Sequence, residues 1–108
     1  MAAGVKREAI WLDPGVGFGK STAHSLALMA HLDRLTGLGF KTLLGVSRKR
    51  FIQAVDPTAV QAVDRLGGSL ACAVIGAEAD VDAVRVHDVR ETVQALKVWA
   101  AVKDARAL

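Results

Sequence analysis

Short apolar runs alternate along this chain with longer stretches in which apolar residues recur at helical spacing. The short runs predict strands, at residues 9–12, 41–46 and 83–87. The longer stretches predict helices, at residues 21–39, 60–79 and 89–105. Residues 1–8 form a polar lead-in, and the folded part is expected at 9–108. Three strand–helix units in a row predict an α/β fold with parallel strands, in which sequential strands are neighbours.

The ends of the predicted helices carry residues that suit helix termini. Ser21 or Ser25 is expected to cap the first helix, and Gly37 or Gly39 to end it. Asp88 lies directly before the last helix, where its side chain is expected to be the N-cap. The leucine and methionine stripe of the first helix is expected to be a packing face.

A glycine-rich loop follows the first predicted strand, in the stretch AIWLDPGVGFGKS from Ala9 to Ser21. Glycine accepts positive φ and lacks Cβ, so such a loop lets the backbone approach a ligand closely. Its last residues, Gly19-Lys20-Ser21, match the end of a phosphate-binding P-loop, but Pro14 occupies the position of the first glycine. Proline also lacks the N–H that a phosphate cradle uses. A P-loop-like nucleotide binder and a connector without a ligand both stay open.

Charged residues follow each predicted strand at its carboxyl end. Asp13 follows the first strand, and Ser47-Arg48-Lys49-Arg50 follows the second. Arg85 and His87 share one face of the third strand, because side chains alternate along a strand. An Arg and a His there suit an anion-binding surface, whereas the three cations after the second strand could also be a solvated turn. Ligand residues at successive strand ends are typical of a (β/α)₈ barrel, but a full barrel needs about 250 residues.

Composition narrows the class of protein. The 108 residues carry a net charge of +3, which fits small anionic substrates and does not by itself indicate nucleic acid. Cys72 is the single cysteine, so it is expected to be a buried small hydrophobe, as suits a reducing cytoplasm. We expect neither a signal peptide nor a membrane span, because no apolar run is long enough.

Four motifs in this chain resemble the C-terminal portion of the dihydropteroate synthase family: DPGVGFGK, GVSRKRFI, RLGGSLA and RVHDV. Their order and spacing also match, over about residues 10–98. The resemblance implies a partial (β/α)₈ TIM barrel made of the last three βα units. It also implies a transferase of folate biosynthesis, which joins 6-hydroxymethyl-7,8-dihydropterin diphosphate to p-aminobenzoate and releases pyrophosphate.

The resemblance further implies which residues bind the two substrates. Asp13 and Lys49 would contact the pterin, whose adjacent N–H donors suit a carboxylate acceptor. The p-aminobenzoate side of the pocket would be lined by Gly17, Phe18 and Arg50. Arg50 stands where many members of the family have Ser, and Arg suits a carboxylate partner.

Arg85 and His87 would bind the diphosphate that leaves. Breaking the carbon–oxygen bond develops negative charge on this group, and cations stabilise that charge most in the transition state. We therefore expect His87 to be protonated when diphosphate is bound. The family also implies Mg²⁺, but its ligand belongs to the N-terminal part of the family, so no metal ligand is expected in this chain.

The resemblance leaves out the N-terminal motifs of the family. The metal ligand, two flexible loops and part of the pterin pocket have no counterpart here, so we expect this chain alone not to be a competent synthase. It is expected to be a fragment, a truncated gene product or one half of a split enzyme. In the full-length protein, the late helices are expected to form a homodimer.

There are two further alternatives, one from a different class of protein and one from the same structural neighbourhood. A non-catalytic remnant or interaction module would use the small-residue helix near Gly67 and the last helix to pair with another chain. The pterin-binding domain of a methyltetrahydrofolate methyltransferase is disfavoured by the SRKR and RVHD motifs, since that chemistry has no diphosphate to hold.

Overall fold

Three parallel strands form the centre of the fold, as predicted. The computed structural model describes residues 6–17 and 21–107. Strand β1 (Trp11–Leu12) pairs with β2 (Lys41–Leu44), and β2 pairs with β3 (Ala83–Val84), so the order in the sheet is β1-β2-β3. Because the strands are parallel, their carboxyl ends and the loops that follow lie at one edge of the sheet.

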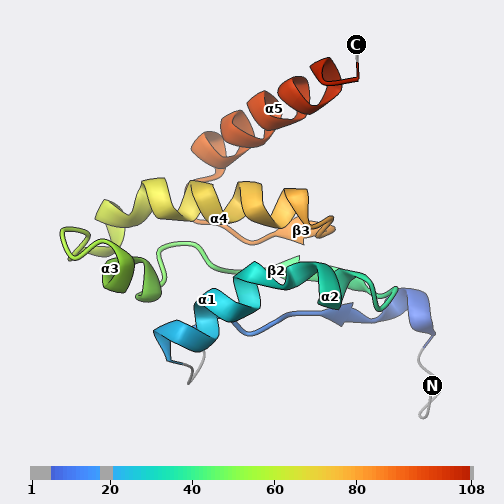
Figure 1. The fold of residues 1–108 in the computed structure, drawn as a ribbon, viewed down its shortest axis with the longest axis horizontal. Helices are drawn as coiled ribbons and strands as arrows, with labels where there is room; N and C mark the ends of the chain where they lie inside the picture. The colour runs from blue at the N-terminus through green and yellow to red at the C-terminus, as the bar shows by residue number, and fades with distance from the viewer. Residues whose placement is uncertain (1–5, 18–20, 108) are drawn as a thin grey trace.

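Helices connect the strands and cover the sheet (Figure 1). The α-helices are α1 (Thr22–Ala30), α2 (Leu32–Thr36), α3 (Phe51–Val55), α4 (Leu66–Glu78) and α5 (Val89–Ala105). Two 3₁₀ helices are η2 (Arg7–Ala9) and η3 (Ala62–Arg65). In Figure 1, α4 lies above the strands, α1 and α2 pass across β2, and α5 extends away beyond α4. The arrangement is that of three consecutive βα units of a partial barrel.

The first predicted helix is divided into α1 and α2, because the chain turns at His31. Ser21 is the N-cap, and its hydroxyl accepts the backbone N–H three residues further on at 3.2 Å. Ser25, the other predicted cap, is instead buried within α1. Gly37 ends α2 as predicted. After the turn, Leu32 enters the core and is 2% exposed.

The second and third strands both end before their predicted limits at Val46 and His87. The N–H of Arg85 still donates to the carbonyl of Leu44 at 2.8 Å, which is the last bond of this ladder. Beyond it, the backbone bonds to a side chain: the N–H of His87 donates to Ser47 Oγ at 3.2 Å. The strands are therefore short because the backbone at their ends leaves the ladder and bonds to a side chain of the neighbouring loop.

The second predicted helix begins later than expected, at Leu66 rather than Val60. The residues before it form η3, which has its own capping box between Gln61 and Asp64. Hydrophobic periodicity does not separate a single 3₁₀ turn from the first turn of an α-helix. Helix α3 lies outside the predicted helices altogether.

The core is aliphatic and small. Its buried cluster consists of Val16, Met29, Leu32, Leu44, Val46, Phe51, Ile52 and Cys72. Gly76 of α4 lies so close to β2 that a Cβ there would be 2.7 Å from Leu44 Cδ2. Cys72 is buried, as predicted, and burial raises the pKa of its thiol to about 11. The thiol therefore stays neutral at physiological pH.

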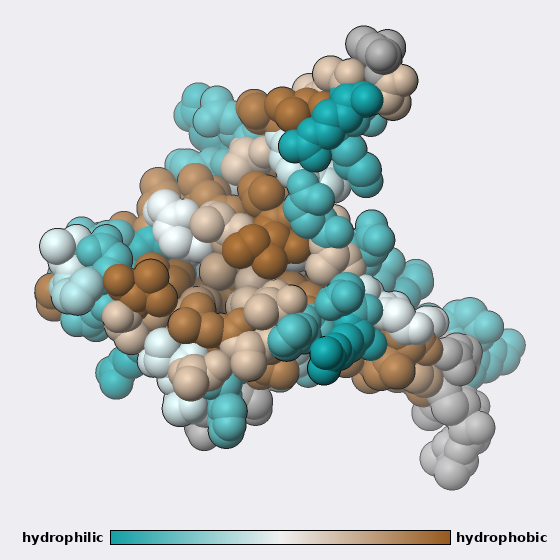
Figure 2. All heavy atoms as spheres, viewed as in Figure 1, coloured by the Kyte–Doolittle hydropathy of each residue, from teal (hydrophilic) through white to brown (hydrophobic). Residues whose placement is uncertain are grey.

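Helix α5 rests on α4 with one side only. Among its residues only Thr92 is buried, and the indole N–H of Trp99 donates to Glu78 Oε1 of α4 at 2.6 Å. Four valines of α5 stay exposed: Val89, Val93, Val98 and Val102. Figure 2 shows apolar surface along this helix beside charged residues. In the part of the chain that the structure describes, no helix is long and apolar enough to cross a membrane.

Candidate functional site

The segment Ser47–Arg50, here called the basic loop, follows β2. It is held by residues at the starts of α4 and α5. Arg48 forms a two-pronged ion pair with Asp88 at the start of α5, with Nη2–Oδ1 at 2.8 Å and Nε–Oδ2 at 3.2 Å. The backbone N–H of Arg48 donates to Ser69 Oγ at 2.7 Å, and its carbonyl accepts from Arg65 Nη1 at 3.0 Å. The basic loop is therefore a hydrogen-bonded structure and not a solvated turn.

The pairing of Asp88 with Arg48 overturns its predicted role as a side-chain cap. Asp88 is the residue before α5, but its side chain caps no N–H of the helix. The hydrogen bond from Arg48 holds the pKa of Asp88 below its usual value, and Asp88 in turn raises the pKa of Arg48. The arginine fork of Arg48 engages both carboxylate oxygens of Asp88 at once.

Lys49 reaches from the basic loop to the glycine loop. Its Nζ donates to the carbonyl of Val16 at 2.7 Å. Its aliphatic part passes over Gly17 (φ +86°), where a Cβ would lie 2.8 Å from Lys49 Cδ. Burial lowers the pKa of Lys49, the charge of Asp13 acts against this, and the charge of Arg85 adds to it. Lys49 thus lies within electrostatic reach of residues from the ends of both β1 and β3.

Arg85 and His87 converge on one small cavity of about 120 Å³, which Lys49 also lines. The guanidinium of Arg85 lies over Gly45, where a Cβ would be 2.7 Å from Nη2. Nδ1 of His87 lies 3.0 Å from Ser47 Oγ. A hydroxyl can donate to a neutral imidazole or accept from a protonated one, so this contact serves both protonation states. Arg85 and His87 thus lie near each other, but beyond the end of β3 at Val84, and Val86 lines the same cavity, so the alternation predicted along a strand does not account for their meeting.

A second hollow, of about 590 Å³, opens between the basic loop and the start of α1. Gly17, Lys49, Arg50 and Phe51 are among the residues that line it. The structure therefore brings together Gly17 and Arg50, two of the three residues predicted for the p-aminobenzoate side. The third, Phe18, lies outside the described residues.

The glycine loop after Asp13 uses its own N–H groups within the chain. The N–H of Gly15 (φ +71°) donates to Asp13 Oδ1 at 2.8 Å. The N–H of Gly17 donates to Ser25 Oγ at 3.2 Å. In a P-loop such N–H groups point at phosphate oxygens, so these bonds disfavour a P-loop. Lys20, on which that alternative also rests, lies outside the described residues.

Two residues that sequence analysis did not single out organise the basic loop. Arg65 is 7% exposed, and Ser69 is also buried. Ser69 Oγ accepts the N–H of Arg48 and donates to the carbonyl of Arg65 at 2.8 Å. Both residues belong to the RLGGSLA motif, and no local pattern distinguishes a buried arginine from an exposed one.

The donors at this site do not fit Mg²⁺. Within residues 6–17 and 21–107, no group of three or more His, Cys, Asp or Glu side chains could hold a metal ion. The carboxylate of Asp88 is engaged by Arg48, and that of Asp13 accepts the N–H of Gly15. Mg²⁺ prefers an octahedron of oxygen ligands, including carboxylates.

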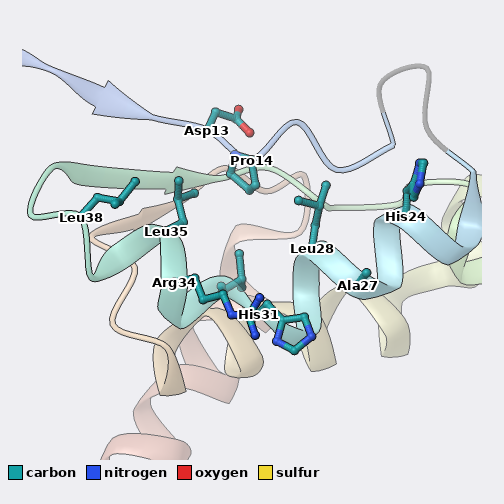
Figure 3. A pocket seen from close by; sticks show the side chains of 10 residues that line it. Asp13, Pro14, His24, Ala27, Leu28, His31, Arg34, Leu35 and Leu38 are labelled. Carbon is teal, nitrogen blue, oxygen red and sulfur yellow. The ribbon is translucent and has the colours of Figure 1, made fainter.

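An apolar groove of about 700 Å³ runs beside the end of β1 (Figure 3). Leu28, Leu35 and Leu38 point from α1 and α2 toward the segment at Asp13 and Pro14. Leu38 is 56% exposed. The predicted packing stripe is therefore covered on one side only, and its other side forms this groove.

Comparison with known proteins gives a consistent result. The pattern of the family described as pterin binding enzyme matches residues 1–87. The dihydropteroate synthase of Escherichia coli K12 is 43% identical over 107 residues, which are 96% of this chain and 36% of that protein. A protein of Mycobacterium leprae named inactive dihydropteroate synthase 2 is 37% identical over 98% of this chain and 36% of its own length.

A solved structure agrees with the fold. Dihydropteroate synthase from Xanthomonas albilineans in complex with 7,8-dihydropteroate superposes with a TM-score of 0.88 at 44% identity, over 93% of this chain and 38% of that one. The chain spans little more than a third of the length of the relatives that it matches. Together with the partial barrel and the cluster of cations at its strand ends, these matches show that the chain belongs to the family of pterin binding enzymes.

Proposed function

We propose that this chain supplies the diphosphate-binding side, and part of the pterin pocket, of a dihydropteroate synthase. One observation carries the proposal: Lys49, Arg85 and His87, from the ends of two adjacent strands, line a single cavity. Three nitrogen donors around one cavity suit a phosphate group. A methyltetrahydrofolate methyltransferase would have no such group to bind.

The proposed reaction joins 6-hydroxymethyl-7,8-dihydropterin diphosphate to p-aminobenzoate. The amine nitrogen of p-aminobenzoate forms a bond to the pterin methylene carbon, and the carbon–oxygen bond to diphosphate breaks with its electron pair leaving on oxygen. The nitrogen then releases one proton to water, which leaves a secondary amine and pyrophosphate. Arg85 and His87 stabilise the charge that develops on the leaving group. Asp13 and Lys49 hold the pterin, while Gly17, Phe18 and Arg50 border the p-aminobenzoate.

The rest of the proposed enzyme lies in the part of the relatives that this chain does not match. We infer that the apolar groove beside β1 receives that preceding part, because a parallel barrel strand needs a neighbour on each side. The Mg²⁺ of the family would be bound by that preceding part, since the described residues of this chain do not fit it. The chain alone is therefore proposed to lack synthase activity.

Binding of pyrophosphate tests the site directly. Isothermal titration calorimetry of this chain with pyrophosphate should show binding, and Arg85→Ala should weaken it at least about tenfold, the loss of one charge-assisted contact. Arg106→Ala, which removes the same charge from the exposed end of α5, should leave the affinity unchanged. Equal losses in both variants would show that binding follows net charge only and would contradict the site.

Pyrophosphate release tests the reaction. The chain is mixed with the preceding part of the Escherichia coli relative, produced separately, and supplied with both substrates and Mg²⁺. We expect release that depends on p-aminobenzoate from the mixture and none from either piece. Activity of this chain alone, at the level of a whole relative, would overturn the proposed incompleteness.

The exposed valines of α5 support a homodimer through the late helices in the full-length protein. Light scattering of the full-length protein should then give the mass of a dimer, and the Val98→Glu variant should give the mass of a monomer. A cytoplasmic location stays a prediction, which fractionation of the natural source would test.

The runner-up is a non-catalytic member of the family. The Mycobacterium leprae relative named inactive is 37% identical and covers 98% of this chain, so the matched region does not by itself establish activity. A mixture that binds pyrophosphate but releases none from the substrates would favour this alternative.

A further inference from the structure

Arg65 is a buried cation without a carboxylate partner among the described residues. Its guanidinium instead donates to oxygen atoms from three segments of the chain: the carbonyls of Arg48 (3.0 Å), Ala59 (3.0 Å) and Val60 (2.8 Å), and Gln53 Oε1 (3.1 Å). Burying a charge is unfavourable unless its hydrogen bonds are satisfied in good geometry. The planar fork of arginine meets that condition here, which lysine would not.

The carbonyl that Arg65 holds belongs to a residue in an unfavourable conformation. Arg48 has φ +58°, the left-handed region that residues with a side chain rarely adopt. Its N–H is fixed by Ser69, its carbonyl by Arg65 and its side chain by Asp88. The backbone N–H, the carbonyl and the side chain of Arg48 are therefore each held, and two of these three contacts come from Arg65 and Ser69, at the start of α4.

The left-handed turn at Arg48 decides where its neighbours point. Lys49 follows directly and reaches the carbonyl of Val16 at 2.7 Å. Ser47 precedes Arg48. Ser47 Oγ accepts the backbone N–H of His87 and also lies 3.0 Å from His87 Nδ1. A right-handed Arg48 would rotate the peptide planes on either side and break both contacts.

We propose that Arg65, together with Ser69, is a positioning residue, which holds Arg48 left-handed and so aims Lys49 and Ser47 at the anion cavity. The identity of the anion rests on the proposed function, but the positioning of the basic loop does not. Arg65 lies under the loop and is not proposed to touch the ligand in this cavity.

The variant Arg65→Lys keeps the charge and removes the fork. We expect the chain to stay folded by circular dichroism, and its affinity for pyrophosphate to fall by about tenfold, as for one lost charge-assisted contact. In this variant Lys49 would move away from its position over Gly17. The pKa of Lys49, followed by NMR at Nζ, should therefore rise toward that of an exposed lysine. Arg106→Lys is the matched control and should change neither measurement.

A purely structural role for Arg65 predicts a different result: lower thermal stability, with the affinity for pyrophosphate and the titration of Lys49 unchanged. That outcome would overturn the proposal. If Arg65→Lys does not fold, Ser69→Ala decides, because it removes only the hydroxyl between Arg48 and Arg65. Ser69→Ala should lower the affinity for pyrophosphate and raise the pKa of Lys49, each by less than Arg65→Lys does. Unchanged values would again overturn the proposal.

Failure of the proposed function looks different from failure of this inference. A wild-type chain that binds no pyrophosphate contradicts the proposed function. In that case the titration of Lys49 alone decides the positioning role: a shift in Arg65→Lys but not in Arg106→Lys supports it, and no shift in either variant contradicts it.

Discussion

The basic loop and the apolar groove differ in how far their side chains find contacts within this chain. Around the basic loop, Arg48, Lys49 and Arg65 all have hydrogen-bond partners within the three βα units. Beside β1, in contrast, the leucines of α1 and α2 line an open groove. The hydrogen bonds of the basic loop are made between the ends of adjacent strands and the helices beside them, whereas an edge strand and its helix need a further unit.

The basic loop is held by contacts within this chain, whereas the groove is open. Arg48 and Asp88, forty residues apart in sequence, meet because β2 and β3 are neighbours. The groove has no such neighbour, and the chain spans little more than a third of its relatives. Variants at the groove should therefore change association with the proposed rest of the barrel, whereas variants at or under the basic loop should change the stability or the anion binding of the chain itself.

The largest expected effect is at the groove. Leu38→Glu places a charge where we propose that the preceding part of the barrel packs, and should weaken association with the separately produced Escherichia coli piece by roughly 100-fold, or about 3 kcal/mol. The thermal midpoint of the chain alone should hardly change, because Leu38 is already 56% exposed.

Val63→Glu is the matched control for the groove, since Val63 is 66% exposed and lies in η3. Association measured by calorimetry should be unaffected by this substitution. Equal weakening by both variants would mean that the groove is not the contact surface.

The packing that supports the basic loop should show the next largest effect. A Cβ at Gly68 of α4 would overlap the buried side chain of Ile52 in α3. Gly68→Ala should therefore lower the free energy of unfolding by about 1–3 kcal/mol, as overpacking does. The measurement is chemical denaturation of the chain.

Gly67→Ala is the control for Gly68→Ala. A Cβ at Gly67 would meet nothing within 4 Å, and alanine favours a helix over glycine by up to about 1 kcal/mol. This variant should be neutral or more stable. Destabilisation of similar size by both would show that the backbone, and not the contact with Ile52, is responsible.

A smaller effect is expected within the anion cavity itself. In Gly45→Ala, the new Cβ would displace the guanidinium of Arg85, the flexible end of an exposed side chain. The fold should persist, and the affinity for pyrophosphate should fall by about tenfold, or roughly 1.4 kcal/mol. Unchanged affinity in calorimetry would indicate that Arg85 does not bind the anion from its place over Gly45.

The smallest expected effect is on acid stability. The pKa of Asp88 is held below its usual value by Arg48, so the folded chain binds this proton less readily than the unfolded chain. The pair therefore contributes stability above the unfolded pKa of about 3.9, and this contribution disappears as pH falls through the folded pKa. Asp88→Asn should reduce the loss of stability between about pH 5 and pH 3, measured by denaturation at each pH; an unchanged loss would argue against the pair.

Much of the site followed from rules about strands. The common edge of parallel strands placed Arg85 and His87 near Lys49, and this inference holds because every parallel sheet shares that backbone geometry. The alternation expected along residues 83–87 does not reach Arg85 and His87, because β3 ends at Val84 and Val86 lines the same cavity. Asp88 was wrongly predicted as a cap because local sequence suits both a cap and an ion pair, and only the position of Arg48 decides between them.

By itself, the sequence determined three strands each followed by helix, the parallel sheet, the buried Cys72 and the cations at the strand ends. Apolar periodicity and residue chemistry are local properties, so they can be recognised along the chain. Only the tertiary structure decided that Arg65 is buried beneath the basic loop, that Arg48 is left-handed and that α1 and α2 leave one side open. These features depend on contacts between segments distant in sequence, and hydrogen-bond partners for a buried charge exist only once those segments meet.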